Sequence, residues 1–240
     1  MIRKCILLAA GLGTRLHPIT NNMPKCLVEV HGRPLLEYWL ILLQEHGITN
    51  VLINTHHLHT QVSDYINSIT TSLEITISYE KDLLGSFGTI IHNKDYYKDE
   101  ESLLVANADN LTNINLSKLI KYHFSHDYEA TIALMETTSP SECGIVELGQ
   151  HDKIISYVEK PTDPKTNISN AGVYVFNTSF LRNLEVKEGD LLDIGHDLLP
   201  QLIGRSYGYL LDEFLIDIGS HFSLDRARKT PQSLFTQVSI

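Results

Sequence analysis

An apolar run that continues directly into a glycine-rich loop constrains this chain most. Ile2 to Ala9 is apolar enough for a buried strand, and Ala10-Gly11-Leu12-Gly13-Thr14-Arg15 follows without a break. Glycines directly after a strand let the backbone approach a ligand closely, and successive N–H groups can then hold phosphate oxygens. Arg15, and Lys25 further along, would add charge-assisted contacts. The sequence therefore predicts an anion-binding loop at the end of the first strand.

Two common phosphate-binding loops do not match this segment. No Gly-Lys-Ser/Thr follows at the spacing of a Walker A loop, and Leu16 occupies the third glycine position of the dinucleotide fingerprint. Gly11 and Gly13 taken alone would fit a plain glycine turn with a surface arginine. The missing glycine also argues against an NAD-dependent oxidoreductase.

Strand and helix patterns alternate through the first half of the chain. We expect strands at 2–9, 51–54, 75–79 and 103–106, with helices at 34–46 and 58–69. This alternation predicts crossover units, and therefore an α/β fold with a mixed, mostly parallel central sheet. Ligands of such sheets bind at the carboxyl ends of the strands, where the glycine-rich loop and Asn107 to Asn110 would lie.

The second half is less regular, and no linker separates it from the first. Strands are expected at 130–135, 144–148, 154–158 and 172–176, and a helix at 193–203. A length of 240 residues fits one domain. We expect a single domain over 1–240, with a core at about 1–128 and a second portion at about 129–240.

Charge and cysteine content exclude several classes of protein. The formal net charge is -10 and no Lys/Arg cluster occurs, so a nucleic-acid partner is not expected. The apolar run before Gly11 is too short to span a membrane. Cys5, Cys26 and Cys143 are odd in number and widely spaced, as in free thiols of a reducing compartment. We therefore expect a cytoplasmic protein without a membrane partner.

Two aspartates stand at the ends of apolar runs. Asp109 follows the expected strand at 103–106, and Asp217 follows Phe214-Leu215-Ile216. Carboxylates in such positions suit a hard, oxygen-liganded cation such as Mg²⁺. Helix N-caps are the alternative, since aspartate is a preferred cap and Ser220 follows Asp217 closely.

A histidine-rich stretch suggests a metal site at first sight. His56, His57 and His59 lie close together in sequence, but no cysteine or acidic cluster accompanies them. Zinc ligands must converge with closed geometry. A polar loop at the start of a helix is therefore the favoured interpretation.

The glycine-rich loop belongs to an ordered set of motifs that resembles the sugar-1-phosphate nucleotidyltransferases. The resemblance runs from about Ile2 to about Leu224. It begins with the segment Leu8 to Leu16, Pro24-Lys25 and Gly32-x-Pro34-Leu35. The later motifs, in order, are Leu84-Gly85-Ser86-Phe87-Gly88-Thr89, Val105-Ala106-Asn107-Ala108-Asp109-Asn110, Gly144-Ile145-Val146-Glu147, Glu159-Lys160-Pro161, Asn170-Ala171-Gly172-Val173-Tyr174 and Asp217-Ile218-Gly219.

The resemblance implies a fold and an activity. The fold would be the Rossmann-like, three-layer α/β/α nucleotidyltransferase fold. The activity would be that of an enzyme that joins a nucleoside triphosphate to a sugar 1-phosphate and releases pyrophosphate. The cofactor would be Mg²⁺, held by Asp109 and Asp217. Lys25 would hold a triphosphate oxygen, and Arg15 would stabilise charge on the departing pyrophosphate.

The resemblance also implies two sets of binding residues, for a nucleotide-binding core at about 1–128 and a sugar-phosphate-binding portion at about 129–240. The nucleotide would contact Ala10, Gly11, Gly13, Thr14, Gly85 and Gly88. The sugar phosphate would contact Gly144, Glu159, Lys160 and Asn170. Because Lys160 precedes Pro161, we expect an extended backbone there.

The sequence departs from the family pattern in places that bear on the substrate. Phe87 stands where the family has alanine, and its ring could stack on a base, narrow the pocket or point into the core. Ser86 replaces threonine and Ala108 replaces glycine. The chain ends at Ile240, without the C-terminal left-handed β-helix of longer members, which suggests a short catalytic form.

Likeness to short guanylyltransferases makes GTP and mannose 1-phosphate the preferred substrate pair. Uridylyl, thymidylyl or cytidylyl transfer, and a heptose or amino-sugar phosphate, stay open. So do an alditol or choline phosphate acceptor, a catalytically inactive regulatory subunit, and assembly as a homo-oligomer. The retained Arg15, Lys25, Asp109 and Asp217 argue against an inactive subunit.

Overall fold

The computed structural model describes residues 2–186 and 190–235, which divide into two compact units. The aspartate unit comprises Arg3–Leu83, Ala106–Asn115 and residues 213–235. The glutamate unit comprises Ile2, Leu84–Val105 and the described part of Leu116–Asp212. This division does not follow the expected split near residue 128. Residues 84–105 group with later ones because α3 (Gly85–His92) packs against the turn at Ile194–Leu198.

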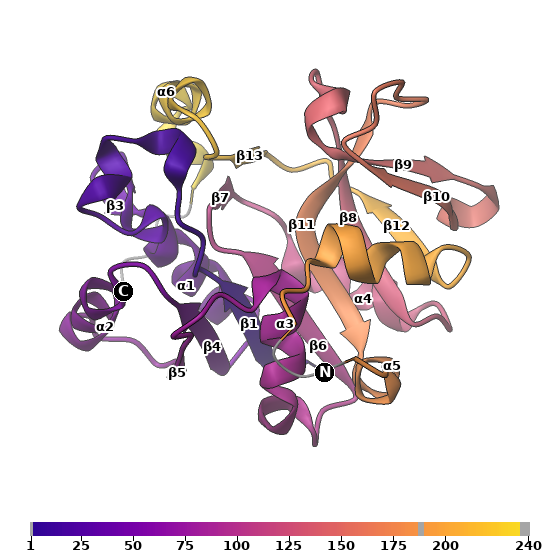
Figure 1. The fold of residues 1–240 in the computed structure, drawn as a ribbon, viewed down its shortest axis with the longest axis horizontal. Coiled ribbons are helices and arrows are strands. Elements are labelled where there is room, and N and C mark those ends of the chain that lie inside the picture. Colours follow the sequence, from indigo (N-terminus) through magenta and orange to yellow (C-terminus); the bar gives the residue numbers. More distant parts are fainter. Residues whose placement is uncertain (1, 187–189, 236–240) are drawn as a thin grey trace. The chain divides into compact units, whose positions relative to one another are not determined.

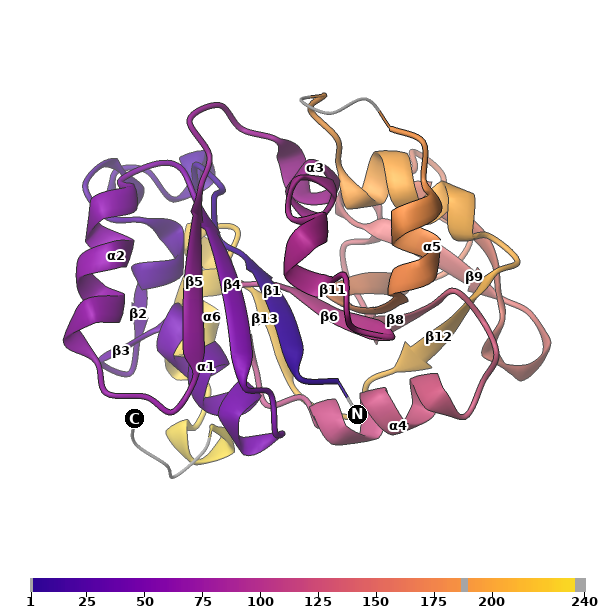
Figure 2. The same ribbon diagram turned by 90° about the horizontal axis from the view of Figure 1, so that it is seen from below.

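Three parallel strands form the sheet of the aspartate unit. Strands β1 (Lys4–Leu8), β4 (Asn50–Thr55) and β5 (Glu74–Tyr79) pair in parallel, and Figure 2 shows them side by side. The connections contain helices α1 (Leu35–Glu45) and α2 (His59–Ser68). Parallel strands need such crossovers because a tight turn reverses the chain. The strands and helices predicted in this region are confirmed to within a few residues.

The C-terminal residues complete the aspartate unit. Strand β13 (Leu215–Asp217) pairs antiparallel with β7 (Asn110–Thr112), and α6 (His221–Lys229) follows it. Figure 1 shows α6 beside the N-terminal segment that holds the short ribbon of β2 (Glu29–Val30) and β3 (Arg33–Pro34). The C-terminal residues 213–235 pack against this N-terminal segment because apolar side chains of both belong to one buried cluster. Members of this cluster are Leu16, Val28, Val30, Leu35, Tyr38, Leu111, Ile216, Ile218, Leu224, Ala227 and Phe235.

The glutamate unit is mainly antiparallel. Strand β11 (Ile168–Asn177) pairs antiparallel with β8 (Ala130–Glu136) and β9 (Gly144–Leu148), and β9 with β10 (Ile154–Glu159). Strand β12 (Ser206–Leu210) pairs in parallel with β8. Helices α4 (Leu116–Phe124) and α5 (Thr178–Asn183) also belong here, and β6 (Ser102–Asn107) leads into the aspartate unit. Parallel and antiparallel pairs together confirm the predicted α/β fold with a mixed sheet.

Short 3-10 turns connect these elements. They span Thr14–Leu16, Ile19–Asn21, Lys25–Leu27, Lys94–Tyr97, Pro140–Glu142, Gln150–Asp152, Leu199–Leu202 and Gln232–Leu234.

One predicted helix is wrong. Residues 193–203 contain a π-type turn at Ile194–Leu198 and then the 3-10 turn at Leu199–Leu202, with no α-helix. Pro200 lies inside this segment, and a proline there removes an N–H donor that a continuous helix needs.

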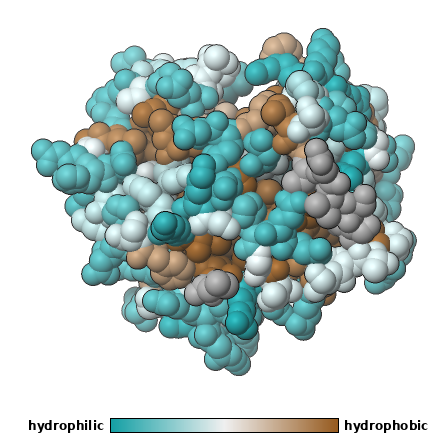
Figure 3. All heavy atoms as spheres, turned by 180° about the vertical axis from the view of Figure 1, so that it is seen from behind, coloured by the Kyte–Doolittle hydropathy of each residue, from teal (hydrophilic) through white to brown (hydrophobic). Residues whose placement is uncertain are grey.

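Three further features concern the membrane-spanning potential, the surface and the cysteines. No helix in the described ranges has the length and apolar character needed to cross a bilayer. Figure 3 shows one face on which apolar residues lie in separate patches among hydrophilic ones. Cys5, Cys26 and Cys143, all within the described ranges, form no disulfide.

Candidate active site

Four charged side chains converge in the aspartate unit. The Lys25 ammonium donates to Asp109 Oδ2 at 2.5 Å and to Asp217 Oδ1 at 3.4 Å. The Arg15 guanidinium lies 4.0 Å from Asp217 Oδ2. The structure thus brings together the residues to which the sequence assigned the triphosphate, the pyrophosphate and the metal. Their catalytic roles stay predictions.

Apolar neighbours position these four residues. Leu16, Val28, Leu111, Ile216 and Ile218 lie next to or near the charged residues in sequence, and all five belong to the buried cluster of the aspartate unit. Burying a side chain of this size stabilises the fold by roughly 1.5–3 kcal/mol. These buried neighbours therefore fix the backbone next to each charged residue. The charged residues can then meet although they come from distant parts of the chain.

The ribbon of β7 and β13 joins the two aspartates. Asp217 is paired with Asn110 in its register, and the Ile218 amide donates to the Asp109 carbonyl at 3.0 Å. The helix-cap interpretation of Asp217 is wrong, because Ser220 caps α6 through a capping box with Ser223. Asp109 lies between β6 and β7 and begins no helix.

Burial and charge together set the electrostatics of this cluster. Burial would lower the pKa of Lys25, but the carboxylates of Asp109 and Asp217 outweigh it and raise that pKa. The pKa of Asp217 is also raised, first by burial and then by the charge of Asp109, although Lys25 and Arg15 oppose this. The two carboxylates therefore repel each other, and a cation between them relieves the repulsion.

The donor set fits Mg²⁺ better than zinc. In the part of the chain that the structure describes, no group of three or more His, Cys, Asp or Glu side chains could hold a metal ion. Asp109 and Asp217 contribute only two carboxylates here, and their role as metal ligands stays a prediction. Mg²⁺ characteristically binds through one or two carboxylates together with substrate phosphates and water.

The two loop glycines have different surroundings. Gly13 has φ 64°, and a Cβ there would lie 3.0 Å from Thr20 Cγ2 and 3.2 Å from Lys25 Cβ. Thr20 Oγ1 also donates to the Gly13 carbonyl at 2.8 Å, so the loop itself requires this glycine. Gly11 is exposed, and a Cβ there would have no neighbour within 4 Å. Ala10 is buried, and Thr14 begins a 3-10 turn. A side chain at Gly11 would therefore enter open space, and the role of this glycine in binding stays a prediction.

Sequence reasoning missed Asn54, which anchors the start of the loop. Its Oδ1 accepts from the Ala9 amide at 2.7 Å, and its Nδ2 donates to Glu80 Oε1 at 2.8 Å. Asn54 and Glu80 are 3% and 4% exposed. The available signal was a polar residue at the carboxyl end of an expected strand, which is where ligands of parallel sheets bind.

Predicted sugar-phosphate residues gather in the glutamate unit. Glu159 is paired with Gly144 across β9 and β10, and Glu159 Oε2 accepts from the Tyr157 hydroxyl at 2.5 Å. A Cβ on Gly144 would lie 2.1 Å from that hydroxyl and 2.7 Å from Glu159 Oε2. Gly144 therefore makes room for these two side chains. Tyr157 was missed because its position in a strand suggests only packing.

Asn170 lies in the same unit, at an irregular part of β11. Its Nδ2 donates to the Tyr174 hydroxyl at 2.7 Å, and its Oδ1 accepts from the Gly172 amide at 2.9 Å. The pairing register of β11 with β8 shifts between Asn170 and Tyr174. This irregularity fixes the orientation of the Asn170 amide.

The expectation of an extended Lys160 is wrong. Its φ is 46°, in the left-handed region, and its amide donates to the Cys143 carbonyl at 3.0 Å. This hydrogen bond joins the residue before the start of β9 to the residue after the end of β10. A non-glycine residue in such a conformation costs of order 1–3 kcal/mol. The Lys160 side chain is 63% exposed, and its ammonium lies 3.9 Å from Glu159 Oε1.

The motif at 84–89 is mostly helix rather than an open loop. Gly85 has φ 78°, and a Cβ there would lie 2.2 Å from the Leu192 carbonyl oxygen. That carbonyl accepts from the amides of Phe87 and Gly88 at 2.9 and 3.1 Å. A Cβ on Gly88 would lie 3.2 Å from the Asp190 carbonyl oxygen. Both glycines are thus explained by the close approach of residues 190–192.

Phe87 and Ser86 face different surroundings. Phe87 is fully buried, so of the three interpretations of its ring, the one in which it points into the core is confirmed. Ser86 Oγ donates to Asp193 Oδ2 at 2.8 Å and accepts from the Ile194 amide at 2.7 Å. These bonds fasten the start of α3 to the turn after Asp193.

The histidine-rich stretch has separate partners. His56 Nδ1 lies 2.8 Å from the Glu80 carbonyl, His57 Nε2 lies 3.1 Å from the Thr20 carbonyl, and the His59 ring packs on Tyr79 at 4.3 Å. Each ring therefore points to a different neighbour.

A family model and named relatives match most of this chain. The model described as "Nucleotidyl transferase" matches residues 4–233. The mannose-1-phosphate guanylyltransferase catalytic subunit beta of Dictyostelium discoideum is 30% identical over 221 residues, which cover 90% of this chain. The protein of the same name from Drosophila melanogaster is also 30% identical over 221 residues, 90% of this chain. The chain spans about six tenths of these relatives' length, 61% and 59%.

Solved structures share the fold. HddC from Yersinia pseudotuberculosis, complexed with GMP-PN, superposes with a TM-score of 0.80 at 24% identity, covering 95% of this chain and 99% of that one. A UDP-glucose pyrophosphorylase complexed with UDP-glucose gives a TM-score of 0.81 at 22% identity, covering 95% and 97%. At such identities the likeness establishes the α/β architecture and nothing finer.

Proposed function

Since this chain belongs to the nucleotidyl transferase family, we propose that it transfers a nucleotidyl group from a nucleoside triphosphate to a sugar 1-phosphate. The observation that carries the proposal is the cluster of Lys25, Arg15, Asp109 and Asp217. Two cations and two carboxylates meet beside a glycine-rich loop that follows a parallel strand. A protein that only binds phosphates would need the two cations but not the two carboxylates. The carboxylates are explained if a metal ion also binds.

The reaction joins two anions, so charge neutralisation dominates catalysis. An oxygen of the sugar phosphate attacks the α-phosphorus, a new P–O bond forms, and the bond to the leaving pyrophosphate breaks. Lys25 would hold a triphosphate oxygen, and Arg15 would stabilise charge on the pyrophosphate. Arg15 can move to the ligand because its side chain is 70% exposed.

Mg²⁺ would be held by Asp109 and Asp217. When bound, it would neutralise phosphate charge and orient the phosphates. Without a cation the two carboxylates would repel the substrate. Lys25, which lies between them and is only 10% exposed, keeps them together.

The sugar 1-phosphate would bind in the glutamate unit. Glu159 would accept hydrogen bonds from sugar hydroxyls, and Lys160 would contact the phosphate. Gly144 and Asn170 would line the same region. The support for this assignment is that Gly144, Glu159 and Lys160 lie together at one end of the ribbon of β9 and β10.

For the substrate pair we propose GTP and mannose 1-phosphate. Support comes from the two relatives named as mannose-1-phosphate guanylyltransferases, at 30% identity. Transfer of another nucleotide, or to another sugar phosphate such as a heptose, is the alternative. A catalytically inactive subunit is disfavoured because Asp109 and Asp217 are both present and close to Lys25.

Pyrophosphate release tests the proposal. Purified protein with Mg²⁺ is assayed against GTP, UTP, dTTP and CTP, each combined with several sugar 1-phosphates. We expect release with GTP and mannose 1-phosphate, and loss of release in Asp109→Ala. Asp64→Ala is the matched control, since Asp64 is an exposed aspartate on α2. Release with another pair would replace the substrates, and no release in any combination would refute the activity.

A further inference from the structure

Tyr157 and Glu159 form a pair that the proposed reaction does not yet use. They are two residues apart on β10, so their side chains point to the same face of the strand. The Tyr157 hydroxyl donates to Glu159 Oε2 at 2.5 Å. A hydrogen bond this short, to a charged acceptor, belongs to the stronger class of protein hydrogen bonds.

The surroundings of the pair allow little movement. Gly144 and Gly195 approach it from two sides, and a Cβ on Gly195 would lie 2.7 Å from Glu159 Oε2 and 2.9 Å from the Tyr157 hydroxyl. Tyr157 is 6% exposed. A side chain at either glycine would therefore collide with Glu159 Oε2 and the Tyr157 hydroxyl.

The hydroxyl of Tyr157 acts as a permanent donor. Burial, the hydrogen bond to Glu159 and the charge of Glu159 raise the pKa of Tyr157 far above its ordinary value of 10.0. The proton therefore stays on the hydroxyl at any pH at which the protein would work. Glu159 Oε2 consequently always has this donor.

The other carboxylate oxygen has a different setting. Glu159 Oε1 lies 3.9 Å from the exposed Lys160 ammonium, and the Glu159 side chain keeps 18% of its surface accessible. Asn170 acts on the Tyr157 hydroxyl in the direction that lowers its pKa, and burial and Glu159 outweigh this effect. The two oxygens of Glu159 are thus divided between an enclosed side and a side toward Lys160.

We propose that Tyr157 is a positioning residue for the sugar 1-phosphate: its hydroxyl holds Glu159 Oε2, so that Oε1 is presented beside Lys160 to a sugar hydroxyl. The inference rests on the proposed function and goes beyond it, because it names the group that orients the sugar-binding carboxylate. Tyr157 itself does not touch the substrate. Its effect is on the affinity for the sugar 1-phosphate and not on the nucleotide.

Steady-state kinetics of Tyr157→Phe test this role. We expect KM for the sugar 1-phosphate to rise about tenfold, the effect of losing one hydrogen bond to a charged group. The kcat and the KM for the triphosphate should change by less than about twofold, since neither depends on this bond. Tyr97→Phe is the matched control, because Tyr97 is also buried and its hydroxyl donates to the Ile90 carbonyl at 3.2 Å.

A double variant separates positioning from a general structural effect. If Tyr157 acts through Glu159, then Tyr157→Phe should leave KM for the sugar 1-phosphate unchanged in a Glu159→Ala background. An undiminished effect in that background would overturn the inference. So would a Tyr157→Phe single variant whose KM equals that of the unmodified protein while pyrophosphate release stays intact.

A measurement that needs no activity distinguishes this inference from the proposed function. The ¹³Cζ resonance of Tyr157, assigned by its absence in Tyr157→Phe, should shift in Glu159→Ala if the hydrogen bond exists in solution. If the resonance shifts but the unmodified protein has no transferase activity, the hydrogen bond is supported and the proposed reaction is refuted. An unchanged resonance would refute the contact whatever the activity.

Discussion

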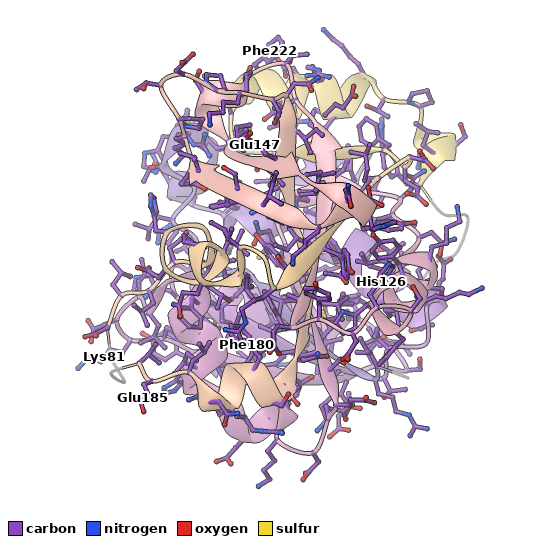
Figure 4. All side chains as sticks on the ribbon, turned by 90° about the vertical axis from the view of Figure 1, so that its right-hand side faces the viewer. Lys81, His126, Glu147, Phe180, Glu185 and Phe222 are labelled. Carbon is purple, nitrogen blue, oxygen red and sulfur yellow. The ribbon has the colours of Figure 1, made fainter. Side chains whose placement is uncertain are left out.

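The two units hold their predicted ligand sites together by different forces. In the aspartate unit, the charges of Arg15, Lys25, Asp109 and Asp217 come together from three distant segments, and flanking apolar residues place them. In the glutamate unit, hydrogen bonds join Tyr157 to Glu159 on β10 and Asn170 to Tyr174 on β11, and glycines leave space for the first pair. Figure 4 shows Glu147 in this unit, on β9, where it pairs with Lys165 at 3.5 Å.

This difference suggests a division of labour. A cluster of like and unlike charges is costly to bury but acts strongly on a charged transition state. Directional hydrogen bonds contribute less energy, but they select among hydroxyl arrangements because an unpaired polar group is penalised. We therefore expect variants of the aspartate unit to change the rate, and variants of the glutamate unit to change the affinity for the sugar.

Lys25→Met should lower the activity strongly. It removes the cation between Asp109 and Asp217 without changing side-chain length much. We expect kcat/KM for the triphosphate to fall by about 100- to 1000-fold, as for loss of one transition-state donor. Lys229→Met, at the exposed end of α6, should leave pyrophosphate release unchanged. A loss of less than about tenfold would contradict a rate role for the aspartate unit.

Gly85→Ala should strongly destabilise the glutamate unit. The added Cβ would lie 2.2 Å from the Leu192 carbonyl oxygen, at a φ of 78°. We expect a loss of about 3 kcal/mol in the free energy of unfolding, from backbone strain together with overpacking. Denaturant titration measures it.

Gly47→Ala is the matched control for this change. Gly47 has the same φ of 78°, but a Cβ there would meet nothing within 4 Å. Backbone strain alone should cost about 1 kcal/mol. Equal losses in the two variants would show that the approach of Leu192 to Gly85 does not constrain this unit.

Glu159→Gln should act on the affinity for the sugar. Losing the charge weakens the acceptor for sugar hydroxyls, and we expect KM for the sugar 1-phosphate to rise about tenfold, or about 1.4 kcal/mol, with a smaller change in kcat. Glu147→Gln, on the neighbouring strand, is the control and should behave like the unmodified protein. A fall in kcat without a change in KM would contradict the proposal that variants of the glutamate unit change the affinity for the sugar.

Asp217→Asn should have the smallest effect on stability, and in the stabilising direction. Because the folded-state pKa of Asp217 is raised above its ordinary value of 3.8, the folded state binds this proton more tightly than the unfolded state. Stability therefore falls as the pH rises from 3.8 through the folded-state pKa, and the cost persists at neutral pH. The variant removes that cost. Solvent screens a side chain that is 53% exposed, so we expect a rise in Tm of only about 1 °C.

The pH dependence checks the cause. The rise should disappear below pH 3.8, where Asp217 is protonated in both states, while pyrophosphate release is lost at neutral pH. Asp64→Asn should change neither quantity. A lower Tm for Asp217→Asn at neutral pH would mean that attraction to Lys25 and Arg15 outweighs burial and the repulsion from Asp109.

Local patterns were enough for the elements of the parallel sheet. The apolar runs at β1, β4 and β5, and the helical periodicity at α1, predict those elements because each is buried on a regular repeat. The segment at 193–203 failed, since its acidic start and apolar spacing suited a helix that Pro200 interrupts. The pairing of β7 with β13 could not be found, because three-residue strands show no periodicity.

For the candidate site, the sequence alone determined the chemistry: which residues could hold phosphate, metal and sugar, and in what order they occur. Only the tertiary structure decided that Lys25 lies between Asp109 and Asp217, and that Tyr157 holds Glu159. It also decided that Gly85 accommodates Leu192 and that Lys160 has a left-handed backbone. The physical reason is that the type of a side chain fixes what it can bind, whereas distances between such side chains depend on how buried residues far apart in the chain pack together.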